Sequence, residues 1–165
     1  RDLKVSYNSV RTWISAFERF FLVFSISPWT SKIVRSIQKE RKIYMWDSPR
    51  IQDASARFEN MIAIELWRAI TSWNDMGYGF FSLHFIKNKE QQEVDFLIAE
   101  RNKPLVLIEA KLTDTKPSAA LKRFQTALGI PAVQLTEKGE GFRILSQGGQ
   151  SVLIAPAYQW LSLLP

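Results

Sequence analysis

The sequence predicts a mixed fold of the α/β or α+β class around a central sheet, and three observations support this prediction. Segments with helical spacing of apolar residues alternate with short strand-like runs, in the order helix, three strands, helix and strand. The 165 residues are 46% hydrophobic and 23% charged, which is typical of a globular chain and not of a disordered one. This length fits one ordinary domain or two small ones.

The N-terminal third combines a predicted helix with strand-like runs. Apolar residues recur at helical spacing over residues 9–20, which predicts an amphipathic helix. Residues 22–27 favour a strand, and Pro28 ends it. Residues 30–46 allow two interpretations, because their first half fits a helix whereas residues 42–46 fit a strand.

A domain boundary is predicted after Asp47, because Asp47, Ser48 and Pro49 interrupt the pattern. We therefore expect a small winged-helix-like basic segment, residues 1–47, and a second domain, residues 48–165. The predicted elements of the second domain are a helix over 54–73, strands over 80–86, 94–99 and 105–112, a helix over 118–129, a strand over 132–135, and a hairpin of 142–146 with 151–154.

The composition excludes several classes of protein. No cysteine is present, so disulfides, zinc–thiolate sites and thiol nucleophiles are excluded. The longest uncharged tract, residues 144–165, contains Gly148, Gly149 and Pro156, which is incompatible with a continuous apolar membrane helix. We therefore expect a cytoplasmic protein that does not enter the membrane. The chain begins with Arg1, so we expect it to be a fragment of a longer protein.

The positive charge is concentrated near the N-terminus. Residues 1–50 hold ten basic and four acidic side chains, whereas the remaining residues hold twelve of each. The net charge of +6 therefore comes from the first fifty residues. Such a segment on a balanced body indicates an anionic partner, with nucleic acid first, although a basic surface without a partner is the alternative.

Charged side chains interrupt two of the apolar runs. Glu109 and Lys111 lie two residues apart near the end of the run 105–112, so both project to one face of the predicted strand. Asp95 lies in the preceding run, and a hairpin centred on Asn102 brings it close to Glu109. An unpaired charge buried there costs several kcal/mol, roughly, so the structure must compensate it.

A divalent cation is one way to compensate two neighbouring carboxylates. Carboxylates about 4 Å apart repel by about 4 kcal/mol at an effective dielectric constant of 20. Oxygen ligands suit Mg²⁺ or Mn²⁺, so Asp95 and Glu109 are candidate metal ligands, with Lys111 beside them. Glu59 borders the apolar stripe of the helix over 54–73 and is a third candidate acid, whereas Glu65 is rotated away by about 120°.

These residues carry a resemblance to a known superfamily. Glu59 on a helix, Asp95 on a strand and Glu109-Ala110-Lys111 on the next strand resemble the PD-(D/E)XK nuclease superfamily. More closely, the chain resembles the C-terminal domain, of unassigned function, of prokaryotic AAA-type ATPases. Phe58-Glu59-Asn60, Glu93-Val94-Asp95-Phe96, Ile108-Glu109-Ala110-Lys111 and the link Lys42 to Asp47 match the patterns of that family, and the resemblance covers nearly the whole chain.

The resemblance implies a fold, a site and partners. It implies a restriction-endonuclease-like core of helix, three-stranded meander, helix and strand, with Asp95 and Glu109 as metal ligands, Lys111 as the catalytic lysine and Glu59 as a supporting acid. Gln125 in the following helix is a further candidate. The basic residues expected to meet DNA are Lys32, Arg35, Lys39, Arg41 and Lys42.

Two functions remain open at this stage. One is Mg²⁺- or Mn²⁺-dependent hydrolysis of phosphodiester bonds, and the other is a non-catalytic module that binds DNA or protein for an attached ATPase. No phosphate-binding loop is present, so the ATPase and any ATP site lie outside this sequence. A homo-oligomer is a further expectation. His84 has no matching triad partners and is interpreted as an ordinary strand histidine.

Overall fold

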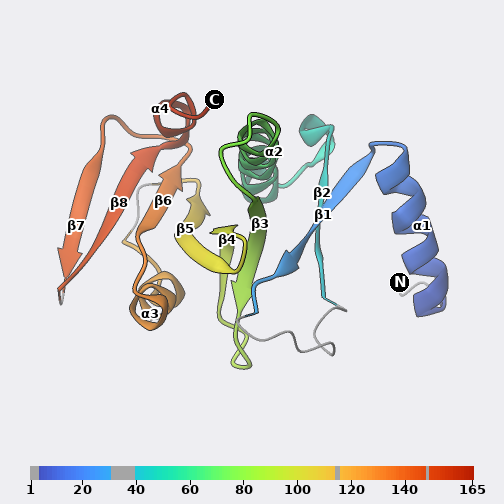
Figure 1. Cartoon of the computed structure of the whole chain (residues 1–165), viewed down its shortest axis with the longest axis horizontal. Helices are drawn as coiled ribbons and strands as arrows, with labels where there is room; N and C mark the ends of the chain where they lie inside the picture. Colours follow the sequence, from blue (N-terminus) through green and yellow to red (C-terminus); the bar gives the residue numbers. More distant parts are fainter. Residues whose placement is uncertain (1–3, 31–39, 114–115, 148) are drawn as a thin grey trace.

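The chain builds one mixed eight-stranded sheet with helices packed against it (Figure 1). The computed structural model describes residues 4–30, 40–113, 116–147 and 149–165. The helices are α1 (Tyr7–Arg19), α2 (Ala54–Asp75), α3 (Ala119–Leu128) and α4 (Ala157–Leu161), and a short 3₁₀ helix is η1 (Ser48–Arg50). The strands are β1 (Val23–Pro28), β2 (Lys42–Met45), β3 (Phe81–Lys87), β4 (Glu93–Glu100), β5 (Lys103–Lys111), β6 (Ala132–Thr136), β7 (Arg143–Gln147) and β8 (Gln150–Pro156).

The strand order in the sheet is β2-β1-β3-β4-β5-β6-β8-β7. Strands β3, β4 and β5 form an antiparallel meander, and β6 then runs parallel to β5 after the crossover through α3. The predicted mixed α/β class and the order of these elements are confirmed. The sequence did not predict η1 or α4. The specific assignment to a restriction-endonuclease-like core stays a prediction.

Helices cover both faces of the central strands. On one face, Phe58, Ile62 and Leu66 of α2 pack with Phe96 and Ile108 of the sheet. On the other face, α3 contributes a separate cluster, which contains Leu97, Leu107, Leu121 and Phe124. Burial on both faces explains why β4 and β5 are nearly continuous apolar runs instead of alternating ones.

A bulge at the start of β4 changes the direction of its side chains. His84 of β3 lies opposite Leu97, whereas Ile86 lies opposite Val94, so β4 carries one more residue than β3 in this interval. In consequence Val94 and Leu97 pack in the same cluster although they are three residues apart. Bulges of this kind redirect side chains and are frequent beside functional sites. Asp95 lies within this bulge.

The N-terminal segment joins the same sheet as the rest of the chain. Strand β1 pairs with β2 in antiparallel orientation and with β3 in parallel, with Ser27 opposite His84. The predicted boundary after Asp47 therefore does not separate two sheets. The strand expected at residues 42–46 is present as β2. The alternative helix around residues 33–37 lies outside the described residues.

Helix α1 stands at one end of the molecule, beyond β1 and β2 (Figure 1). Ser6 caps it by accepting a hydrogen bond from the Ser9 amide, and none of its residues is buried. Trp13 and Phe17 on its apolar side are nearly half exposed. None of the helices in the described part of the chain is long and apolar enough to cross a membrane.

Candidate functional site

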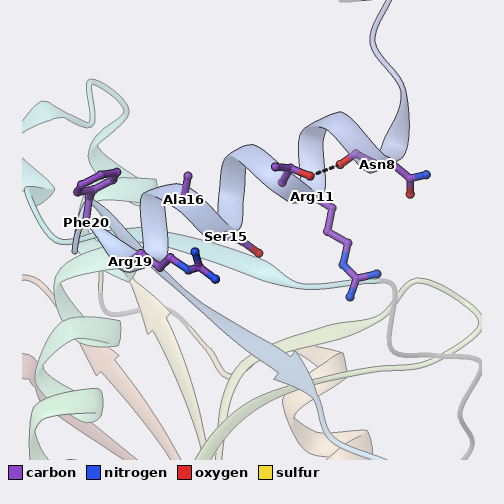
Figure 2. Close-up of a pocket in the computed structure, with 7 residues that line it drawn as sticks. Asn8, Arg11, Ser15, Ala16, Arg19 and Phe20 are labelled. Atoms are coloured by element: carbon purple, nitrogen blue, oxygen red, sulfur yellow. Dashed lines mark hydrogen bonds between the residues drawn. The ribbon is translucent and has the colours of Figure 1, made fainter.

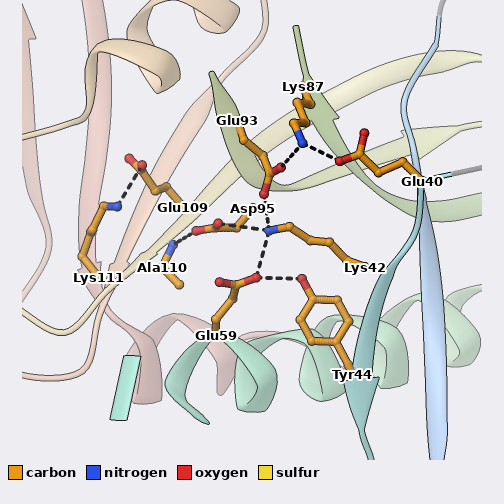
Figure 3. A network of polar contacts seen from close by, with 10 residues as sticks. All are labelled: Glu40, Lys42, Tyr44, Glu59, Lys87, Glu93, Asp95, Glu109, Ala110 and Lys111. Atoms are coloured by element: carbon orange, nitrogen blue, oxygen red, sulfur yellow. Dashed lines mark hydrogen bonds and ion pairs between the residues drawn. The ribbon is translucent and has the colours of Figure 1, made fainter. Parts of the chain in front are cut away.

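The candidate site lies where β2, β4 and β5 approach the first half of α2, and its centre is the ammonium group of Lys42 (Figure 3). Lys42 Nζ lies 2.9 Å from Glu59 Oε1, 2.8 Å from Glu93 Oε1 and 3.4 Å from Asp95 Oδ1. Its side chain is 20% exposed. We call Lys42, Glu59, Glu93 and Asp95 the Lys42 cluster.

The alternation of side chains along β2 places two donors on Glu59. Lys42 and Tyr44 are two residues apart and project to the same side of the strand. The Tyr44 hydroxyl donates a hydrogen bond of 2.8 Å to Glu59 Oε1, which also accepts from Lys42. Next to Glu59 on α2, the buried Asn60 donates to the Met45 carbonyl and accepts from the Met45 amide, at 2.7 and 2.8 Å. These bonds hold β2 against α2.

Asp95 connects the Lys42 cluster to β5. The β4–β5 ladder begins at the pair Phe96 and Ile108, and just beyond it Asp95 Oδ2 accepts a hydrogen bond of 2.9 Å from the Ala110 amide. Burial and the negative charge of Glu59 raise the pKa of Asp95 from 3.8 to about 6, although Lys42 and the Ala110 amide oppose this rise. The nearby charge of Glu109 adds to the rise of this pKa, so the two carboxylates are electrostatic neighbours.

The charges around Lys42 and Tyr44 favour the protonated form of both groups. Burial works to lower the pKa of Lys42, but the charges of Asp95 and Glu59 and hydrogen bonds to Glu93 and Glu59 raise it above its ordinary value. Burial and the charge of Glu59 raise the pKa of Tyr44 as well. Both side chains therefore stay protonated at neutral pH and act as hydrogen-bond donors to Glu59.

Glu109 and Lys111 form the other part of the site. Glu109 is only 3% exposed, and its Oε1 lies 3.2 Å from the Lys111 ammonium group. Its Oε2 is buried and has no hydrogen-bond partner in the described part of the chain. Lys111 is 40% exposed, so it can meet a ligand from solvent. Figure 3 places this pair beside Asp95, on the far side of Ala110 from Lys42.

The donor types at Asp95 and Glu109 are those that a divalent ion prefers. A buried carboxylate oxygen without a donor is an atom that a cation would satisfy, and Glu109 Oε2 is such an atom. Mg²⁺ often binds through one or two carboxylates and keeps several waters, so Asp95 and Glu109 suffice as side-chain ligands. In the described ranges, no group of three or more His, Asp or Glu side chains is arranged to hold a metal.

The structure brings the four predicted site residues to one end of the sheet, but in two parts. Glu59 and Asp95 share Lys42, whereas Glu109 pairs with Lys111. The preference for Glu59 over Glu65 is consistent with this arrangement, because Glu65 pairs with Arg68 at 2.9 Å. Glu93 and Tyr44 were not among the predicted site residues.

The predicted DNA-binding residues are only partly described. Lys32, Arg35 and Lys39 lie outside the described residues. Arg41 is about half exposed and donates to the Ser25 hydroxyl at 3.2 Å. Lys42 is committed to the carboxylates of its cluster, a role that sequence reasoning missed.

Two further polar residues belong elsewhere in the fold. Gln125 of α3 is buried and donates to the Ser151 carbonyl of β8 at 2.8 Å, which gives it a structural contact on another strand. His84 contacts the Ser27 carbonyl at 3.3 Å and the Ser82 hydroxyl at 2.9 Å. Burial lowers the pKa of His84, although the Ser27 carbonyl opposes this. His84 lies on β3, as the sequence predicted.

Helix α1 carries a second polar surface, a pocket of about 530 Å³ (Figure 2). Arg11, Ser15 and Arg19 extend from the same side of the helix into it. All three side chains are exposed, and among the described residues neither arginine has a carboxylate partner. Arg11 and Arg19 contribute to the predicted basic charge of residues 1–50 but were not among the residues predicted to meet DNA.

These features define a mixed α/β domain with a cluster of carboxylates and lysines at one end of its central strands. A model of the family described as a domain of unknown function, DUF4143, matches residues 54–158, and the chain belongs to that family. A model of a second domain of unknown function, DUF8612, matches residues 1–49.

One solved structure is similar to the chain. It is a half-complex from a tetradecameric assembly of Thermococcus gammatolerans McrB AAA+ hexamers with bound McrC, with 16% sequence identity and a TM-score of 0.43. The similarity covers 63% of this chain and 28% of that chain, so this chain spans less than a third of the length of the similar chain. No curated protein matches the chain.

Proposed function

We propose that this chain is a nuclease-like module of an AAA-type ATPase and that it hydrolyses phosphodiester bonds of DNA. The observation that carries the proposal is the environment of Glu109, a buried carboxylate with one oxygen unpaired. It lies beside the partly exposed Lys111, and the amide of the next residue, Ala110, donates a hydrogen bond to Asp95. The sequence resemblance of Phe58-Glu59-Asn60 and the later motifs to C-terminal domains of such ATPases supports the ATPase as the partner.

Each side chain of the site has a role in this proposal. Asp95 and Glu109 would hold Mg²⁺ or Mn²⁺, which when bound would polarise the phosphate and lower the pKa of a bound water. Lys111 is the most exposed charged group of the set and binds the phosphate or orients the attacking water. Glu59 keeps Lys42 and Tyr44 in place behind Asp95 and acts as a positioning residue.

Replacement of Lys111 tests the activity. We expect the unmodified chain to cleave DNA with Mg²⁺ or Mn²⁺ and Lys111→Ala to lower the cleavage rate by about a hundredfold or more, the typical cost of one transition-state donor. Lys103→Ala is the matched control, because Lys103 lies at the exposed start of the same strand. Equal rates for Lys111→Ala and the unmodified chain, or no cleavage of single- or double-stranded DNA, would contradict the proposal.

A second candidate function is a non-catalytic DNA-binding module. The observation that favours it is the Lys42 ammonium group, which already neutralises part of the acidic charge at the site. Helix α1 supports a DNA contact, because Arg11 and Arg19 are eight residues apart, or about 12 Å along the helix axis. This separation is close to the width of the DNA major groove, about 12 Å.

Removal of both α1 arginines tests the DNA contact in either case. We expect Arg11→Ala with Arg19→Ala to weaken duplex binding and to reduce the slope of log affinity against log salt by about 2, since each phosphate contact contributes about 0.9. The control removes Arg68 and Arg123, two exposed arginines of the balanced region. An unchanged salt slope in the α1 variant would rule out this contact. Fluorescence anisotropy at several salt concentrations measures it.

A further inference from the structure

The Lys42 cluster holds more negative than positive charge. Glu59, Glu93 and Asp95 surround one ammonium group at 3.4 Å or less. Lys87 adds a second ammonium at the rim, where it pairs with Glu40 and lies 3.9 Å from Glu93. Carboxylates this close repel one another unless a cation lies between them. In this fold the cation at the centre is a side chain of the protein.

The lysine at the centre comes from a different segment than the carboxylates do. Lys42 belongs to β2, within residues 1–49, the part of the chain that matches DUF8612. Glu59, Glu93 and Asp95 belong to residues 54–158, the part that matches DUF4143. Among the described strands, β2 is the outermost at that end of the sheet, and it pairs with β1. The acidic site of one segment is therefore completed by an edge strand of the other.

An unsatisfied group lies beside this arrangement. Glu109 is almost wholly buried, and no hydrogen-bond donor in the described residues reaches its Oε2. Lys42 neutralises the carboxylates on one side of Asp95 but does not reach Glu109. Asp95 Oδ1 faces the ammonium group of Lys42, whereas Asp95 Oδ2 accepts a hydrogen bond from the Ala110 amide. A cation that binds both Asp95 and Glu109 must therefore share Asp95 with Lys42.

We propose that Lys42 is a built-in cation that competes with a divalent metal ion for Asp95, so that the N-terminal segment controls metal binding at the site. This inference rests on the part of the proposed function that assigns Asp95 and Glu109 as metal ligands. The long flexible side chain of lysine allows the ammonium group to leave the cluster while β2 stays paired. With Lys42 in place, the site binds a divalent ion weakly. With Lys42 withdrawn, Asp95 becomes available to bind the ion together with Glu109.

Calorimetric titration of the chain with Mn²⁺ tests the competition directly. We expect Lys42→Met to bind Mn²⁺ about tenfold more tightly or better, since a positive charge a few ångströms from the ion has been removed. Lys87→Met is the matched control, because Lys87 is equally buried and also contacts Glu93 but lies away from Asp95. Its affinity should equal that of the unmodified chain. Equal or weaker binding by Lys42→Met, or no Mn²⁺ binding by any of the three, overturns the inference.

A second measurement needs no variant and therefore does not depend on how Lys42→Met folds. Lysine methylation of the unmodified chain, followed by mass spectrometry, reports how often the Lys42 amine leaves its ion pairs. Saturating Mg²⁺ should raise the labelling rate of Lys42 several-fold and leave that of Lys87 unchanged. An unchanged Lys42 rate overturns the inference. Cleavage of DNA is scored separately, so competition without cleavage refutes only the proposed activity, and cleavage without competition refutes only this inference.

Discussion

Replacing Lys42 by methionine is expected to lower the free energy of unfolding by about 3 kcal/mol at pH 7.5, the scale for removing one partner from a buried ion pair. Methionine keeps most of the apolar stem, so the main loss is the charge. Three carboxylates would then face one another without the ammonium group that now lies within 3.4 Å of each. Urea unfolding monitored by circular dichroism measures the difference.

The size of this effect should depend on pH in a defined direction. Burial and the Glu59 charge already raise the pKa of Asp95 from 3.8 to about 6 in the folded chain, and removal of Lys42 raises it further. A carboxyl whose folded pKa is raised contributes stability that is fully present below the unfolded value and is lost as the pH rises through the folded value. The loss in Lys42→Met should therefore be small near pH 4 and grow as the pH rises through 6.

Lys42→Arg is the control for charge. It keeps the cation and should recover part of the stability and abolish most of the pH dependence of the difference. A constant loss between pH 4 and pH 8 in Lys42→Met would show that packing, and not charge, accounts for the effect. No loss at any pH would mean that the Lys42 cluster contributes nothing to stability.

Asn60→Ala is expected to destabilise the chain by about 2–3 kcal/mol, because it leaves the amide and the carbonyl of Met45 without partners at a partly buried position. Asn60 is 3% exposed, so water cannot easily replace the two lost hydrogen bonds. The same substitution should loosen β2 and, with it, Lys42 and Tyr44. Thermal unfolding and the amide exchange of β2 measure the two effects.

The chain contains a matched control for this substitution. Asn74 makes the same pair of hydrogen bonds to the amide and the carbonyl of Phe81, at 2.7 and 2.9 Å, but at an exposed position. Asn74→Ala should cost less than about 1 kcal/mol, since water replaces the lost bonds. Equal losses for Asn60→Ala and Asn74→Ala would refute the role assigned to burial.

Local patterns in the sequence were sufficient to predict the positions of most helices and strands. Helical periodicity, capping by Asp53 and Ser118, and the glycine after α3 are local signals, and the helices α2 and α3 lie where these signals predict them. Gly129 has a φ of +64°, which glycine adopts at a helix C-terminus without strain. The small helix α4 carries no such signal, because no side chain caps it.

Part of the candidate site was also predictable from local patterns in the sequence. Glu109 and Lys111 interrupt an apolar run, and charged side chains in such a run are visible in the sequence. The hairpin symmetry that brings Asp95 near Glu109 follows from the length of the turn, and the structure pairs Phe96 with Ile108 accordingly. The bulge that turns Asp95 toward Glu59 has no such signal, because it depends on how β3 pairs with β4.

Residue order, periodicity and the interruptions of apolar runs were enough to predict a mixed α/β chain, the positions of most of its helices and strands, and an acidic pair with a lysine near it. The central position of Lys42 came from long-range packing: β2 joins the edge of the sheet through β1, and Asn60 holds it against α2. A lysine in a basic segment has the same local pattern whether it faces solvent or three carboxylates. Its electrostatic environment depends on side chains that lie 17 to 53 residues away in the sequence, and only folding brings them together.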